Sequence, residues 1–243
     1  MLDYIKFLVK KNTKNKFLWL LFSIIVIIYF ALVFLNTNSF TIRGIASFNF
    51  MFDFYVSITL MGYIIYPVKM IGEYKEGFLI DSILSGYKRS EIYIANFLIY
   101  FLICTLFTLA LPIIVIGYTS IVNGFGLEIS VAVLRNLGVF FIKILLASLT
   151  FSSIYYFLAF TINNLPVYML LAITFHMSLQ SLIHLQEGLL YEIVKYTLIL
   201  DLPDVFSYQT DYRKLLDMSL HSLLTTSFFL VIGYLIFRKR KIK

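Results

Sequence analysis

Apolar residues gather into six runs along the chain, separated by polar or charged connections of varied length. The runs cover residues 17–35, 50–70, 91–117, about 138–161, 166–185 and 218–237. A helix rises 1.5 Å per residue, so roughly 20 apolar residues cross the hydrocarbon core of a bilayer. No internal repeat or low-complexity linker divides the chain. The pattern predicts a single all-α, polytopic membrane domain over 1–243 with six transmembrane helices.

Residues 1–16, before the first run, have a pattern of their own. Four apolar side chains lie near one face of a helix, with lysines elsewhere: Leu2, Ile5, Leu8 and Val9. This arrangement is typical of an amphipathic helix lying in the membrane interface. The alternative is an ordinary basic flank that only sets the topology.

Residues 186–217, between the fifth and sixth runs, form a long acidic connection. Its apolar part, 189–202, is too short to span a membrane. Leu198, Ile199 and Leu200 nevertheless need cover from water. We therefore expect an extracellular packed subdomain, or a partly re-entrant pair of helices, rather than a free loop.

Composition agrees with a membrane environment. Of the 243 residues, 60% are hydrophobic and 14% charged, whereas about a quarter of the residues of a soluble domain are charged. The single Cys104 lies inside an apolar run, which excludes a disulfide framework and a cysteine metal site. The net charge of +7 comes from residues at the ends of the runs, where anionic headgroups lie. Nucleic acid is therefore not an expected partner.

The basic residues also predict the orientation. With both termini in the cytoplasm, 14 of the 20 Lys and Arg residues lie on the inner side. This bias follows the positive-inside rule for an even number of spans. Lys143 stands near the start of the fourth run, and we expect its side chain to snorkel outward rather than to face a polar cavity.

Residues 71–90 connect the second and third runs on the inner side. Four apolar side chains recur there at three- and four-residue spacings, which puts them on one helical face: Leu79, Ile80, Ile83 and Leu84. Gly86 follows as a left-handed stop, and Ser90 is expected to cap the third span. Exposed apolar residues of this kind normally need a protein partner. The alternative is a segment that folds back onto the bilayer.

This connection resembles that of the type-2 ABC transporter permeases, the six-span subunits of bacterial ABC exporters. In that family an acidic residue and a glycine precede an amphipathic turn, a Ser–Pro-like break, a basic residue and the next span. The chain offers, in the same order, Glu76-Gly77, Phe78–Leu84, Ser85-Gly86 and Lys88-Arg89-Ser90-Glu91. The resemblance extends to the interfacial first helix and to an apolar last span with a basic tail. Gly86 replaces the usual proline and Asn96 a common lysine, which leaves the subfamily open.

The resemblance implies a division of labour. A separate subunit would bind and hydrolyse ATP and dock on a coupling segment formed by Glu76, Gly77, Phe78, Leu79, Ile80, Ile83, Leu84 and Ser85. Two permease subunits, identical or paralogous, would pair in the bacterial cell membrane. The chain has no Gly-rich phosphate loop ending in Lys-Ser or Lys-Thr. We expect it to be no enzyme and to hold no cofactor of its own.

Candidate chemistry within the spans is sparse. His176, Gln180 and His184 recur every four residues and form one polar stripe. The two histidines lie about 12 Å apart along a helix, too far to share one metal ion. A hydrogen-bonding stripe between helices, or a lining of the substrate path at the dimer interface, is the favoured interpretation.

The substrate class follows only by analogy. The aromatic-rich, weakly charged spans suit an amphipathic peptide (an antimicrobial peptide, bacteriocin or peptide toxin) or a hydrophobic drug. The alternative is a stand-alone membrane immunity or toxin-binding protein with no ATPase partner. An intramembrane protease would need close acid–base pairs inside the spans, and the sequence shows none.

Overall fold

The computed structural model describes residues 1–39, 43–128, 130–162, 164–183, 187–208 and 211–239. Every regular element in these ranges is helical. Six helices are long and apolar enough to cross a membrane. The prediction of an all-α protein with six such helices is confirmed, and the chain has the character of a multi-pass membrane protein.

The six spans are formed by the longer helices. They are α2 (Lys16–Ser39), the continuous run of α3 (Phe48–Phe54), the π-helical η2 (Tyr55–Thr59) and α4 (Leu60–Lys75), then α6 (Arg89–Asn123), α7 (Val131–Thr161), α8 (Leu165–Ile183) and α11 (Tyr212–Lys239). Shorter elements cover the two ends of the bundle. They are α1 (Leu2–Thr13), the 3₁₀-helix η1 (Gly44–Ser47), α5 (Phe78–Leu84), α9 (Leu189–Val194) and α10 (Leu202–Val205).

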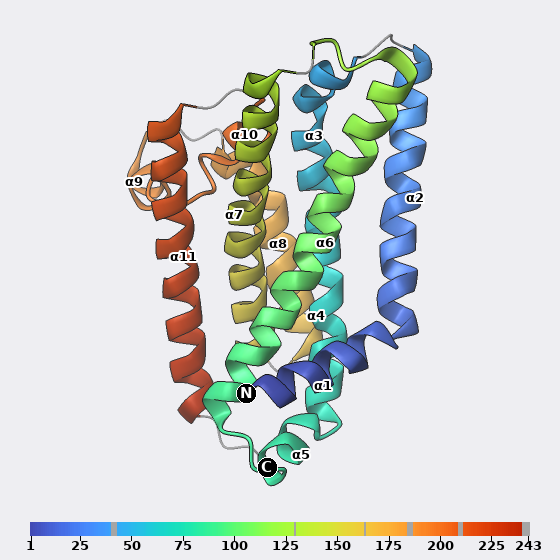
Figure 1. The fold of residues 1–243 in the computed structure, drawn as a ribbon. Coiled ribbons are helices and arrows are strands. Elements are labelled where there is room, and N and C mark those ends of the chain that lie inside the picture. The colour runs from blue at the N-terminus through green and yellow to red at the C-terminus, as the bar shows by residue number, and fades with distance from the viewer. Residues whose placement is uncertain (40–42, 129, 163, 184–186, 209–210, 240–243) are drawn as a thin grey trace.

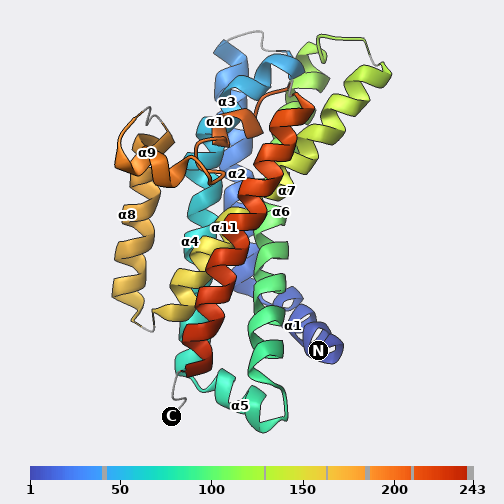
Figure 2. The ribbon, with the colours of Figure 1, turned by 90° about the vertical axis from the view of Figure 1, so that its left-hand side faces the viewer.

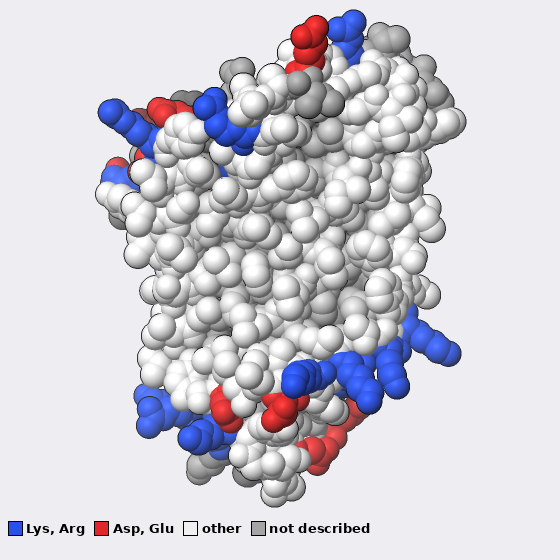
Figure 3. All heavy atoms as spheres, viewed as in Figure 1, with Lys and Arg blue, Asp and Glu red and all other residues white. Residues whose placement is uncertain are grey.

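The spans stand side by side, and the short helices lie at the two ends of the bundle (Figure 1). One end holds α1, which crosses the bundle obliquely, together with α5 and the last turn of α11 (Figures 1 and 2). We call it the basic end, because most of the described Lys and Arg residues lie there. The opposite end holds η1, α9 and α10. Between the two ends, the face seen in Figure 3 is a broad belt without charged side chains, as expected for a surface that meets lipid.

The core centres on α7, which packs against α4, α6 and α11. Buried tyrosines fill much of it, and one of them completes the hydrogen bonding of a helix that contains a proline. Pro67 lies inside α4 and has no N–H to donate to the carbonyl of Tyr63, four residues earlier. The hydroxyl of Tyr100, from α6, donates to that carbonyl instead, at 2.7 Å. The carbonyl of Ile64 likewise accepts from Tyr168 of α8, at 3.0 Å.

Two helix boundaries differ from the predictions. The fourth span begins at Val131 rather than near residue 138, because the Ser130 hydroxyl accepts a hydrogen bond from the Val133 amide and starts the helix earlier. The third span begins at Arg89, so the prediction that Ser90 caps it is wrong. Its first turn is closed by the Glu91 carboxylate, which accepts a hydrogen bond from the Lys88 amide at 3.1 Å.

Candidate functional site at the basic end

The connection between the second and third spans forms a short helix, α5, bounded by two glycines. Gly77 precedes it with φ +92°, and Gly86 follows it with φ +89°. Side chains with a Cβ rarely adopt this left-handed conformation, so both turns favour glycine. The prediction of a left-handed stop at Gly86 is confirmed. We call residues 76–85, which include the coupling segment expected from the sequence, the docking segment.

The inner face of α5 is anchored by α1. Leu79 and Ser82 are both buried, with exposed fractions of 6%. The hydroxyls of Ser82 and Tyr4 share a hydrogen bond of 3.1 Å, and the amide of Asn96, from α6, donates to Tyr4 at 3.4 Å. Burial raises the pKa of the Tyr4 phenol, which therefore stays neutral and able to donate. Tyr4 thus links α1, α5 and α6.

A cluster of charges joins α1 to the end of α4. The ammonium of Lys11 lies 2.7 Å from the Glu73 carboxylate and 3.5 Å from the centre of the Phe78 ring. Lys69 approaches the same carboxylate at 3.1 Å. One glutamate therefore bridges two lysines, and the first residue of α5 packs under one of them.

The outer face of α5 differs from the predicted apolar face. Leu79 points inward, whereas Leu84 is 80% exposed and Ile80 and Ile83 are half-buried. The four residues therefore do not form one exposed surface. Spacing alone does not tell which side of a helix packs inward, and here the buried bond between Ser82 and Tyr4 turns the Leu79 side toward the bundle. Ile80 and Leu84, four residues apart, remain on the outer side.

The first helix also packs differently from the prediction. Tyr4, Leu8 and Asn12 form its buried side, while Leu2 and Val9 are exposed. Asn12 is held in place because its side-chain oxygen accepts a hydrogen bond from Tyr66 at 2.6 Å. Polar partners in the bundle therefore set the rotation of α1, and the apolar stripe predicted to face the membrane is divided between the two sides.

The polar stripe of the fifth span is only partly described. His176 is buried, and its Nδ1 atom has no hydrogen-bond partner among the described residues. The side chain of Gln180 and all of His184 lie outside the described residues. The described ranges contain no group of three His, Cys, Asp or Glu residues that would hold a metal ion. A role for the stripe stays a prediction.

At the opposite end, Lys143 is fully buried, so the prediction that it snorkels outward is wrong. Its ammonium donates to the carbonyls of Asp204 and Ser207 at 2.7 and 2.6 Å. Because the fourth span begins early, Lys143 lies twelve residues inside α7, beneath the segment that contains α10. A single lysine within an apolar run indicates a polar partner inside the protein, and this feature of the sequence could have predicted the buried position of Lys143.

A hydrogen bond and an ion pair hold the same segment to α11. Asp201 lies 2.8 Å from His221, and Asp204 lies 2.5 Å from Lys214. Residues 187–208 thereby pack on the end of the bundle, and Leu198, Leu202 and Val205 are fully buried.

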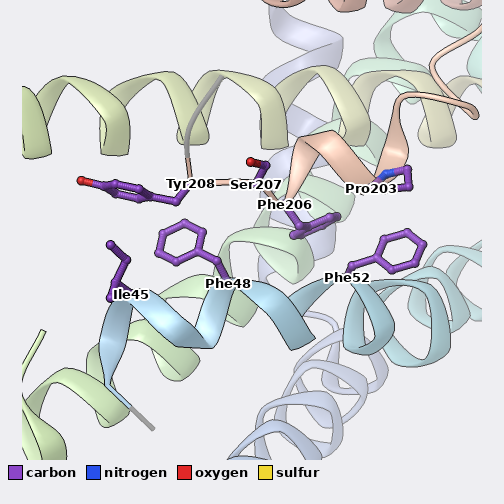
Figure 4. A pocket seen from close by; sticks show the side chains of 7 residues that line it. All are labelled: Ile45, Phe48, Phe52, Pro203, Phe206, Ser207 and Tyr208. Carbon is purple, nitrogen blue, oxygen red and sulfur yellow. The ribbon is translucent and has the colours of Figure 1, made fainter. Parts of the chain in front are cut away.

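Between this segment and α3 lies a cavity of about 540 Å³ (Figure 4). It is lined by Ile45, Phe48, Phe52, Pro203, Phe206, Ser207 and Tyr208. The ring of Phe48 meets that of Tyr208 edge to face, with centroids 5.4 Å apart. The lining exposes polar atoms as well as aromatic and aliphatic ones, so the cavity suits a group of mixed polarity rather than a purely apolar one.

No protein-family model matches the chain, and no curated protein is similar to it. The resemblance to type-2 ABC transporter permeases therefore stays a prediction from the sequence.

Proposed function

We propose that the chain is the permease subunit of a bacterial ABC exporter. The observation that carries this proposal is the docking segment, whose inner face is anchored while its outer face is open. Leu84 is 80% exposed at the end of the bundle where the basic residues gather. An apolar residue held in this way outside the belt is typical of a surface that meets another protein.

The connections of α5 suit a mechanical role. The segment follows α4 directly and leads into α6, so a displacement of α5 acts on two spans together. The second span contains a π-helical turn, η2, and a proline, Pro67. Both are irregularities at which helices bend. Closure of a partner ATPase would push α5 and bend this span.

The proposal also requires two other subunits. A separate subunit binds and hydrolyses ATP, and a second permease subunit, identical or paralogous, completes the path. By the positive-inside rule the basic end faces the cytoplasm, which places both termini there. The substrate we favour is an amphipathic peptide or hydrophobic drug, because the spans are rich in aromatic residues and poor in charged ones, and because the cavity at the opposite end exposes both apolar and polar surface.

The first experiment tests the docking surface. We would co-purify the chain with a candidate ATP-binding cassette protein, and replace both Ile80 and Leu84 with Asp. The matched control is Leu127→Asp, which changes a 46%-exposed leucine in the connection at the opposite end. The docking variant should lose the ATPase, whereas the control should retain it. An ATPase that stays bound and coupled to the docking variant contradicts the proposal.

Folding of both variants is checked with the single cysteine. Cys104 is fully buried, so a thiol-reactive dye labels it only when the bundle opens. Equal labelling temperatures separate lost docking from lost folding. If the chain protects cells from a peptide without any ATPase, the stand-alone immunity protein is the better interpretation.

A further inference from the structure

An apolar groove lies where α1 meets α2 and α6. It has a volume of about 290 Å³, and side chains from all three helices line it, among them Val9, Leu18, Trp19, Phe22, Leu102 and Leu106. Its lining contains two further residues with polar side chains, Asn12 and Thr13, and both bond within the protein. Asn12 pairs with Tyr66 and the Leu8 carbonyl, and Thr13 donates to the Lys10 carbonyl. The groove therefore suits a hydrocarbon chain.

The groove lies beside the start of a candidate membrane span. Leu18, Trp19 and Phe22 belong to the first two turns of the α2 span, next to the basic end. The indole of Trp19 donates to the Thr13 carbonyl at 2.7 Å, which ties the span to α1. On α6 the lining runs from Ile99 to Phe107, about 12 Å at the rise of an α-helix. A segment of an acyl chain fits this length.

Lysines border the groove on α1. Lys6, Lys10 and Lys14 recur every four residues and are exposed, and Lys16 begins α2. Lys10 directly follows the groove residue Val9, and Lys14 directly follows Thr13. Figure 3 shows basic side chains in a row over α1, at the lower edge of the uncharged belt.

These lysines are available to an anion. The described ion pairs at this end engage Lys6, Lys11 and Lys69, and none engages Lys10, Lys14 or Lys16. Long lysine stems lie along apolar surface while their ammonium groups reach headgroup depth. Positive charge beside a hydrocarbon groove is complementary to an anionic phospholipid.

We propose that this groove binds a glycerophospholipid with an anionic headgroup. One acyl chain lies against Trp19 and α6, and the phosphate lies among Lys10, Lys14 and Lys16. The bound lipid holds α1 against the bundle, and α1 in turn anchors α5 through Tyr4. The site needs only a membrane, so its test does not depend on the proposed ATPase partner.

The only tryptophan of the chain, Trp19, reports on the groove directly. We would reconstitute the full chain in mixed phosphatidylcholine and phosphatidylglycerol vesicles, with brominated chains on one lipid at a time. Bromine quenches a tryptophan that it touches. Because one lysine near the surface is worth about fivefold in the binding of an anionic lipid at low salt, we expect at least that preference for phosphatidylglycerol.

Substituting Lys10, Lys14 and Lys16 together with Gln should abolish the preference. The matched control, Gln at Lys75, Arg238 and Lys239, removes the same charge at the same end and should retain it. Leu102→Phe, which fills the groove, should reduce quenching by both brominated lipids, whereas Ile113→Phe, outside the groove on the same helix, should not.

Three results would overturn the proposal. Equal quenching by the two lipids would show ordinary contact with the bilayer. A preference that survives in the lysine variant would show that these lysines do not select the lipid. Negligible quenching by both lipids would show that protein, such as a second copy of the chain, covers the groove.

Discussion

The two ends of the bundle hold their short helices in different ways. At the basic end, α5 is anchored on one side by Leu79 and Ser82, and its other side is open, with Leu84 80% exposed. At the opposite end, the segment that contains α10 is held by the buried Lys143, by the ion pair of Asp204 with Lys214 and by the hydrogen bond between Asp201 and His221. The first arrangement leaves a surface for a partner. The second closes the end of the bundle.

The two ends also differ in the interactions that stabilise them. At the opposite end, one buried ammonium donates to two backbone carbonyls, so its loss removes both hydrogen bonds at once. The basic end combines the buried hydrogen bonds of Tyr4 and Asn12 with the partly exposed ion pairs of Glu73.

The largest expected effect is at Lys143. Lys143→Met retains the volume and removes the ammonium, which leaves the carbonyls of Asp204 and Ser207 without this donor. We expect the free energy of unfolding to fall by about 2–4 kcal/mol. Thermal labelling of Cys104 in detergent measures it. Arg135→Met, at an exposed position of the same helix, is the control, and an equal loss in both variants would contradict the closed-end interpretation.

The next effect separates the two faces of α5. Leu79→Ala removes a buried side chain and should weaken the attachment of α5 by about 2 kcal/mol. Leu84→Ala, on the open side, should change it by less than about 0.5 kcal/mol. Hydrogen exchange of amides 76–85 measures both. Similar exchange in the two variants would mean that the faces are not distinct.

A smaller effect is expected in the span that links the two ends. Tyr100→Phe leaves the Tyr63 carbonyl without a donor, because Pro67 has none, and should cost about 1–2 kcal/mol. Adding Pro67→Ala supplies an N–H to that carbonyl and should recover part of the loss. Thermal labelling of Cys104 follows both variants. A double variant no more stable than Tyr100→Phe alone would show that the tyrosine acts through packing instead.

The smallest effect is expected at the exposed ion pair of the opposite end. Lys214 and Asp204 have side chains that are 45% and 41% exposed. Lys214→Met should therefore cost less than about 1 kcal/mol, and added salt should reduce the difference from the unmodified chain. A loss as large as that of Lys143→Met would show that this ion pair, rather than the buried ammonium, holds α10.

Part of the candidate site at the basic end could be predicted from the spacing of residues along the sequence. Spacing placed a short helix between the second and third spans, and the left-handed stop predicted at Gly86 is confirmed by its positive φ. Pattern did not show that Leu79 faces inward, because the partner that decides this, Tyr4, lies 78 residues from Ser82. The polar stripe of the fifth span stays a prediction, because Gln180 and His184 lie outside what the structure describes.

The sequence by itself determined the six apolar helices, because a run of apolar residues must either leave water or be covered along its whole length. It also determined that most basic residues lie at one end, since their order along the chain fixes them relative to the spans. Only the tertiary structure decided the rotation of α1 and α5 and the partners of Lys143. These depend on single hydrogen bonds between residues 54 to 92 positions apart, and hydrophobic periodicity carries no information about such pairs.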